Sequence, residues 1–268
     1  CGGGAVVEVN CETDFCAKSE AFQQFVKDIC KVVLHDDPAD VEALLQCKYP
    51  DRELTVAEIL PEKVMSIGEN LQIRRFVRFA EPTNVAYVHA GGTHGVLVNL
   101  AVEGDIDATE IGKNVAMQVA SAAPVAVSEA GVPQEVKDSE YNVAVEKTKE
   151  EQVHKAVEAA LRKAGINPAH VDSEDHMESN MGKGWITADD VARAKEIIAT
   201  VSAEKAANLP AAMVENIAKG RLNKFLKENC LLSQEYIWDK NLTVEQYLKS
   251  VDKELTVVDF KRFTLRAE

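Results

Sequence analysis

The sequence has few basic residues and no long apolar run, and both shortages limit what the protein can do. Only 30 Lys and Arg stand against 44 Asp and Glu, which gives a formal net charge of −14. Nucleic-acid binding needs clustered cations that replace counterions, so we expect no direct nucleic-acid partner. Because no apolar run reaches membrane-spanning length and no charged-then-apolar leader opens the chain, we expect a cytoplasmic protein without a membrane partner. An organellar origin stays open.

Familiar signatures of catalysis and cofactor binding are also missing. The six cysteines include no C-x-x-C pair, and no His pair has zinc-finger spacing, so we expect reduced thiols and no metal site. Gly182-Lys183 lacks the upstream glycine and the following Ser or Thr of a phosphate-binding loop. No Ser-His-Asp arrangement can be assigned from spacing. We therefore expect no cofactor and no enzymatic reaction.

The most informative stretch lies near the start of the sequence. A strand pattern, Gly4–Asn10, ends in a polar turn that carries Asp14 and Phe15. Apolar residues at helical spacing follow the turn: Phe22, Phe25, Val26, Ile29 and Val33. A strand-to-helix junction can point side chains outward from a rigid base. The alternative is that Phe15 folds back onto the following helix as a hydrophobic staple.

The chain also repeats itself. The strand pattern at Gly4–Asn10 recurs at Gly95–Ala101, 91 positions later, and a helical pattern follows each copy. Two further pairs of words recur 188 and 187 positions apart: Leu54-Thr-Val with Leu242-Thr-Val, and Ile73-Arg-Arg-Phe76 with Phe260-Lys-Arg-Phe263. The helix after each Leu-Thr-Val opens with a capping-box pattern: Thr55 with Glu58, and Thr243 with Gln246. The offset between the copies grows from 91 to 188 residues, and this difference of about 97 residues predicts an insertion of that length in the second copy.

The inserted segment reads as helical. Ala, Glu and Lys, which are good helix formers, dominate from Pro133 to about Lys227. Apolar residues there form narrow seams typical of a coiled coil, and Asn208-Leu-Pro210 predicts a break. We predict a protruding helical hairpin with an irregular tip over 165–185. In the first copy, Asp37-Pro38 predicts a helix start.

The predicted fold class is α+β, with two repeated strand-helix subdomains and an inserted antiparallel helical hairpin. The first core subdomain spans 1–84, and the second combines 85–132 with 229–268. The hairpin spans 133–228.

One run closely resembles a family signature. It reads Glu8-Val-Asn-Cys-Glu-Thr-Asp-Phe-Cys-Ala-Lys18, and it is similar to the signature of the bacterial-type elongation factor Ts family, which usually has Val where Cys16 stands. Further similar words follow in order: Ile67-Gly-Glu-Asn70, Val115-Ala-Met117, Lys219-Gly-Arg-Leu-Asn-Lys-Phe225 and Leu231-Leu-Ser-Gln234. Three departures stand out. The family's N-terminal three-helix module is not in this sequence, which we expect to weaken partner binding; the hairpin is longer; and Glu235 replaces a usual Pro.

The resemblance implies a guanine-nucleotide exchange factor for the GTPase elongation factor Tu. Phe15 would be a wedge with Asp14 as its polar companion, and together with Thr13 and Cys16 they would displace the segments around the GTPase's Mg²⁺. The resemblance also implies a second set of partner contacts: Gln118, Val119, Arg221 and Lys224.

Two other interpretations compete with this one. The segment His170–His176 could hold a catalytic divalent metal through His and carboxylate groups, although a solvated acidic loop is the simpler reading. Alternatively, the protein is an adaptor whose hairpin is an interaction arm, with Phe15 in the core. Gly220-Arg221 fits either a partner contact or close helix packing.

Overall fold

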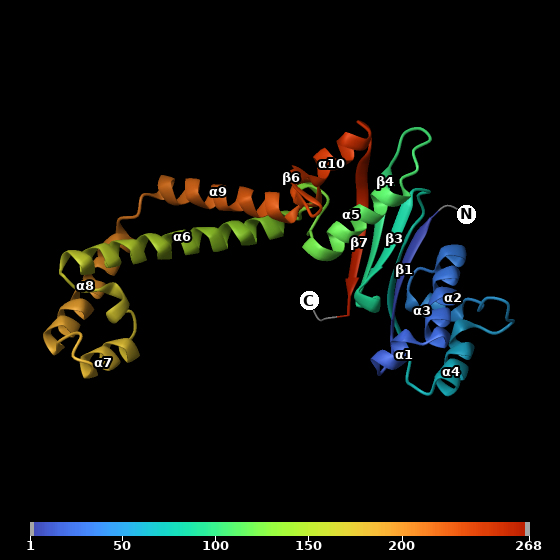
Figure 1. Cartoon of the computed structure of the whole chain (residues 1–268), viewed down its shortest axis with the longest axis horizontal. Helices are drawn as coiled ribbons and strands as arrows, with labels where there is room; N and C mark the ends of the chain where they lie inside the picture. The colour runs from blue at the N-terminus through green and yellow to red at the C-terminus, as the bar shows by residue number, and fades with distance from the viewer. Residues whose placement is uncertain (1–2, 266–268) are drawn as a thin grey trace. The chain divides into compact units, whose positions relative to one another are not determined.

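The computed structural model describes residues 3–265, and most of its helices and strands are labelled in Figure 1. The fold mixes helices with antiparallel sheets and is of the α+β class. It divides into two compact units. The first unit runs to Gly131 and resumes at Lys227, and the second comprises Val132–Leu226. Within the described residues, no helix is both long enough and apolar enough to cross a membrane.

The first unit begins with a two-stranded sheet and its helices. Strand β1 (Gly4–Asn10) pairs antiparallel with β2 (Gln72–Phe79). Four helices lie between them in sequence: α1 (Asp14–Lys18), α2 (Glu20–Asp36), α3 (Val41–Gln46) and α4 (Val56–Ile67). The predicted stripe of α2 is confirmed, since Phe25 and Ile29 are fully buried in the core of this part.

The helix start predicted at Asp37-Pro38 is wrong. Asp37 ends α2 in a left-handed conformation, with φ of 47°. The helix begins three residues later, where the Asp40 carboxylate accepts a hydrogen bond from the Ala43 amide. Both residues are Asp, and an Asp side chain suits a helix end as well as a helix start. The predicted capping box at Thr55 is present.

The rest of the first unit surrounds a three-stranded sheet. Its strand order is β3 (Asn84–His89), β4 (His94–Ala101), β7 (Thr256–Thr264). Helix α5 (Thr109–Ala122) packs against β3 and β4 and buries Val115 and Val119 completely. The short strands β5 (Glu235–Tyr236) and β6 (Asp239–Thr243) and helix α10 (Val244–Val251) complete this part, and the capping box predicted at Thr243 is present.

Strand β1 contacts β3 and β4 without pairing with them. A Cβ on Gly4 would lie 2.6 Å from Leu97 Cδ1, and a Cβ on Gly95 would lie 2.8 Å from Val6 Cγ1. Both glycines therefore permit a backbone approach that a side chain would prevent. Arg75 of β2 adds a polar link, because its Nη2 donates to the Thr264 carbonyl at 3.0 Å.

The second unit is helical. It contains α6 (Gln134–Lys163), α7 (Glu174–Gly182), α8 (Ala188–Ala207) and most of α9 (Ala211–Asn229). The break predicted at 208–210 is confirmed. The irregular tip predicted over 165–185 is wrong: a 3₁₀ turn (Pro168–His170) and α7 form there. A small core includes Ile166, Val171, Met177 and Ile186, which are spaced too irregularly in sequence to show a helical stripe.

Two glycines in helices should respond oppositely to substitution by Ala. A Cβ on Gly112 of α5 would lie 2.3 Å from Val85 Cγ2, whereas nothing lies within 4 Å of a Cβ on Gly220 of α9. Overpacking costs about 1–3 kcal/mol, which exceeds the roughly 1 kcal/mol that Ala gains over Gly in a helix. We expect Gly112→Ala to destabilise the protein and Gly220→Ala to stabilise it, as measured by urea unfolding. Equal stabilisation by both would contradict the packing of α5 on β3.

Candidate functional site

The turn between β1 and α2 holds the exposed aromatic that the sequence singled out. Thr13 caps the five-residue helix α1, and its hydroxyl accepts a hydrogen bond from the Cys16 amide at 3.2 Å. Ser19 begins α2 in the same way, accepting from the Phe22 amide at 3.3 Å. Phe15 is the second residue of α1, and its side chain is 90% exposed. The alternative in which Phe15 folds back onto the following helix as a hydrophobic staple is therefore wrong. Asp14 beside it is also exposed.

A carboxylate from a distant segment fixes this turn. The Glu69 Oε2 atom accepts hydrogen bonds from the backbone amides of Glu12 at 2.9 Å and Thr13 at 3.0 Å, and its Oε1 accepts from the Thr13 hydroxyl. In return, Glu12 accepts a longer bond of 3.4 Å from the Asn70 amide. We call these bonds the Glu69 clamp. It ties the start of α1 to the loop between α4 and β2.

Glu69 is a site residue that was not predicted from the sequence. It lies in the family-like motif Ile67-Gly-Glu-Asn70, but it is 56 positions from Thr13, so no local pattern connects the two residues. A local signal did exist: Gly68 ends α4 in a left-handed conformation, with φ of 83°, which marks a sharp turn directly before the acid.

The clamp shapes the ionisation of the groups around it. The hydrogen bonds from Thr13 and the amide of Glu12 hold the pKa of the Glu69 carboxyl below its ordinary value of 4.5. Burial, assisted by the neighbouring Cys11 and Glu69, raises the pKa of the Cys16 thiol to about 12. Cys16 is buried, so of the four residues predicted to face a partner it is the one that does not reach the surface.

A second exposed apolar side chain lies on the segment that the clamp joins to α1. Met65, in the last turn of α4, is 86% exposed. Contiguous patches of exposed apolar side chains, rather than single ones, are typical of surfaces that bind another protein.

Gln118 and Val119 are not available as partner contacts. Gln118 is 1% exposed and Val119 is fully buried. The Gln118 amide nitrogen donates to the Glu235 carbonyl at 3.0 Å, and its oxygen accepts from the Ile237 amide at 2.8 Å. The prediction chose the wrong face of α5, because Gln118 is a polar residue on the buried face and is used to hold the β5–β6 turn.

Arg221 and Lys224 lie on α9 within the second unit. Arg221 is partly exposed, and its guanidinium bonds Glu151 and the Thr148 hydroxyl of α6. Lys224 is exposed. The close-packing alternative for Gly220 is wrong, since its Cβ position is open.

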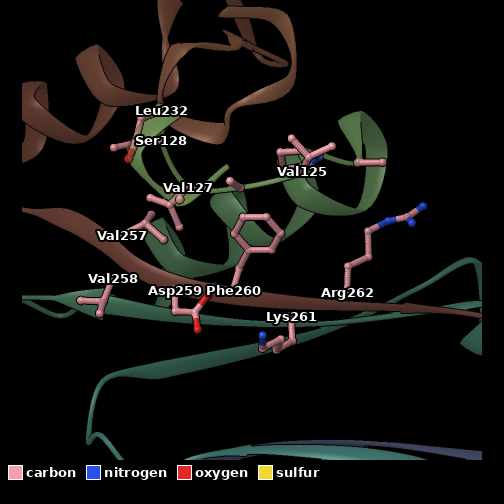
Figure 2. A pocket seen from close by; sticks show the side chains of 14 residues that line it. Val125, Val127, Ser128, Leu232, Val257, Val258, Asp259, Phe260, Lys261 and Arg262 are labelled. Carbon is pink, nitrogen blue, oxygen red and sulfur yellow. Dashed lines mark hydrogen bonds between the residues drawn. The ribbon is translucent and has the colours of Figure 1, made fainter. Parts of the chain in front are cut away.

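A surface hollow of about 870 Å³ lies elsewhere in the first unit, beside β7 (Figure 2). Phe260 points from β7 toward the segment that carries Val125 and Val127 (Figure 2). The charged side chains that line the hollow, such as Asp259 and Lys261, follow one another along β7 and do not converge on a common point. None of the predicted site residues lines it.

The metal-site alternative at the hairpin tip lacks a ligand cluster. His176 bonds Asp172, and His170 lies against the Trp185 ring at a centroid distance of 5.5 Å. Across residues 3–265, the one group of three His, Cys, Asp or Glu side chains close enough to share a cation is Cys11, Cys16 and Glu69.

We expect Glu69→Ala to loosen the turn without unfolding the unit. Hydrogen exchange of the Glu12 and Thr13 amides should accelerate by about tenfold or more, because the variant removes their charged acceptor. In the native protein, the clamp should persist at pH values above 4.5 and be lost as pH falls through the lower pKa of folded Glu69. Glu62→Ala, which removes an exposed carboxylate from α4, the helix before the Glu69 loop, is the control and should leave both amides protected. Unchanged exchange in Glu69→Ala would contradict the clamp.

Gln118→Leu should destabilise the free protein. The variant leaves the half-buried Ile237 amide without its acceptor, and an unpaired donor away from water costs about 1–3 kcal/mol. Urea unfolding of the chain alone measures the loss, and Lys113→Ala on the exposed face of α5 should change it by less than about 0.5 kcal/mol. Wild-type stability in Gln118→Leu would return Gln118 to the candidate partner contacts.

Comparison with known proteins places the chain in a family. The model of the family described as Elongation factor TS matches residues 12–166 and 152–267. The chain is 54% identical over 267 residues to elongation factor Ts of Bacteroides fragilis, covering 100% of this chain and 80% of that protein. It is 50% identical to the same factor from Parabacteroides distasonis, covering 98% of this chain and 79% of the relative. It is 34% identical to the factor from Syntrophotalea carbinolica, covering 98% of this chain and 71% of the relative. The chain belongs to the elongation factor Ts family.

Proposed function

We propose that this chain promotes release of GDP from elongation factor Tu, with Phe15 as the wedge that opens the Mg²⁺ site. The observation that carries the proposal is the 90% exposure of Phe15 on a short helix that is capped at both ends and clamped by Glu69. A Phe ring exposed to this extent presents apolar surface that contact with a protein partner would remove from water. The net charge of −14 favours a protein partner over nucleic acid.

The proposed mechanism is a difference in affinity between two states of the partner. An exchange factor accelerates GDP release only if it binds the nucleotide-free GTPase more tightly than the GDP-bound one. A Phe ring supplies this preference if it fits between partner helices only after the Mg²⁺ site has been deformed. By linkage, GDP and Mg²⁺ then weaken the complex by the same factor.

A rigid turn suits this role. A side chain on a mobile loop loses conformational entropy when it binds, which reduces affinity. The Thr13 and Ser19 caps and the Glu69 clamp fix the backbone on both sides of Phe15 before the partner arrives. Asp14 lies beside Phe15 at the surface and serves as its polar companion, and Thr13 and Cys16 act by holding α1 in place.

We also propose that the first unit contains two copies of one subdomain. The β1–β2 ladder is irregular directly after Glu8, and the β4–β7 ladder directly after Asn99, 91 positions later. Both residues are buried polar groups, 5% and 2% exposed. Beyond the bulges, buried Ile73 and buried Val257 hold matching positions. The sequence motifs matched Ile73 of the first copy with Phe260 of the second, which differs by three residues from the match between Ile73 and Val257.

The domain bounds of the proposal follow those predicted from sequence. Residues 1–84 form the first copy, 85–132 with 229–268 the second, and 133–228 a helical hairpin inserted in the second. Arg221 and Lys224 would contact the partner from this hairpin. Gln118 and Val119 act indirectly, by packing α5 and holding the β5–β6 turn in place.

Release of a fluorescent GDP analogue from elongation factor Tu tests the wedge. We expect Phe15→Ala to reduce the acceleration by at least about tenfold, equivalent to roughly 1.4 kcal/mol of lost differential binding. The variant should keep its thermal stability, because the ring makes little contact with its own fold. Trp238→Ala, which removes an aromatic that is 65% exposed on a different segment, is the matched control and should retain full acceleration.

Two outcomes would overturn parts of the proposal. Full acceleration by Phe15→Ala would keep the exchange activity but remove Phe15 as its cause. No acceleration by the native chain, with binding to the GTPase still detectable, would favour the adaptor alternative.

A further inference from the structure

Two thiols and a carboxylate meet beside the exposed Phe15. Cys11 follows β1, Cys16 lies in α1, and Glu69 comes from the loop after α4. One ligand atom from each lies within 4.8 Å of the other two. We propose that Cys11, Cys16 and Glu69 form a binding site for a thiophilic divalent cation of the Zn²⁺ class.

The donor set suits such a cation. Two sulfurs and one carboxylate oxygen are ligands that Zn²⁺ accepts in tetrahedral sites, with water as a fourth ligand. Sulfur lies about 2.3 Å and oxygen about 2.1 Å from Zn²⁺, so neighbouring ligand atoms in a formed site are about 3.5–4 Å apart. The ligand atoms here are already within 4.8 Å of one another, so closing the site requires them to approach by about 1 Å.

Glu69 is oriented as a metal ligand should be. Carboxylates that bind metals are themselves hydrogen-bonded, and these outer bonds fix their direction. Here two backbone amides bond Oε2 and the Thr13 hydroxyl bonds Oε1. Each carboxylate oxygen can accept two bonds, which leaves Oε1 with capacity for a cation.

The partial exposure of Cys11 allows a cation to reach the site. Cys16 is buried, whereas Cys11 is half-buried and its Sγ atom contacts the Thr13 carbonyl at 3.4 Å. A cation can therefore enter from the Cys11 side, and water can complete the coordination there. The low exposure of Cys16 protects its thiolate bond to the metal from exchange with solvent.

Occupancy would have a structural consequence. Cys11 and Cys16 stand on either side of Asp14 and Phe15 in the sequence, so a shared cation would close a small ring through the turn and join it to Glu69. The turn would then be held by coordinate bonds in addition to the clamp. The site does not depend on the proposed exchange activity, and its test does not use that activity.

The test is titration of the full chain with Co²⁺, in the presence of a phosphine reductant, which adds no competing thiolate. We expect one equivalent to bind with sulfur-to-cobalt charge-transfer absorption and the intense visible bands of tetrahedral coordination, and Zn²⁺ to displace it. Cys16→Val, an apolar substitution of similar size, and Cys11→Ser should each bind at least about tenfold more weakly. Cys47→Ser, which removes a thiol outside the cluster, should bind like the native chain.

Further variants keep the result decisive. Glu69→Gln retains an acceptor oxygen for the amides and should weaken Co²⁺ binding while the charge-transfer bands remain at saturation. Circular dichroism checks that each variant is folded. The proposal is wrong if the native chain shows no thiolate bands, if the bands persist unchanged in folded Cys16→Val, or if Cys47→Ser abolishes them.

Discussion

The Glu69 clamp is the interaction on which the candidate site depends. A five-residue helix is too short to be stable alone, because helix nucleation costs more than a single turn returns. Helix α1 therefore needs support from outside the helix. The Glu69 carboxylate at its N-terminus provides this support by accepting hydrogen bonds from two backbone amides that the helix itself leaves unpaired. The same bonds connect α1 to the loop that follows α4, and both helices pack on one core, which sets the position of the turn that carries Phe15.

The core in turn depends on close approaches between strands. Gly4 and Gly95 let β1 pass against β4, and Arg75 bonds both the buried Glu8 and the Thr264 carbonyl. A buried carboxylate needs such partners, because desolvation without them would strongly disfavour its charged form. Since β1 leads directly into the turn, the packing of this strand positions the site as well as the fold.

Local features of the fold could be predicted from sequence, whereas contacts between distant segments could not. The α2 stripe and the Thr55 capping box follow from spacing alone, because helical periodicity and caps are determined within a few residues. The Glu69 clamp and the Cys11–Cys16–Glu69 cluster join segments more than 50 positions apart, so no spacing rule could reveal them. The resemblance pointed to the turn, but it did not show what holds the turn in place.

The errors at Gln118 and at the hairpin tip have a common cause. Sequence patterns treat polar residues as surface, yet Gln118 is buried because its amide satisfies two backbone groups of the β5–β6 turn. In the tip, apolar residues too sparse to form a stripe still build a small core around Met177 once the chain has turned back on itself. Exposure therefore has to be taken from the fold. By that measure Phe15 is an exposed aromatic on a clamped turn, whereas Gln118 is a buried residue that holds the β5–β6 turn.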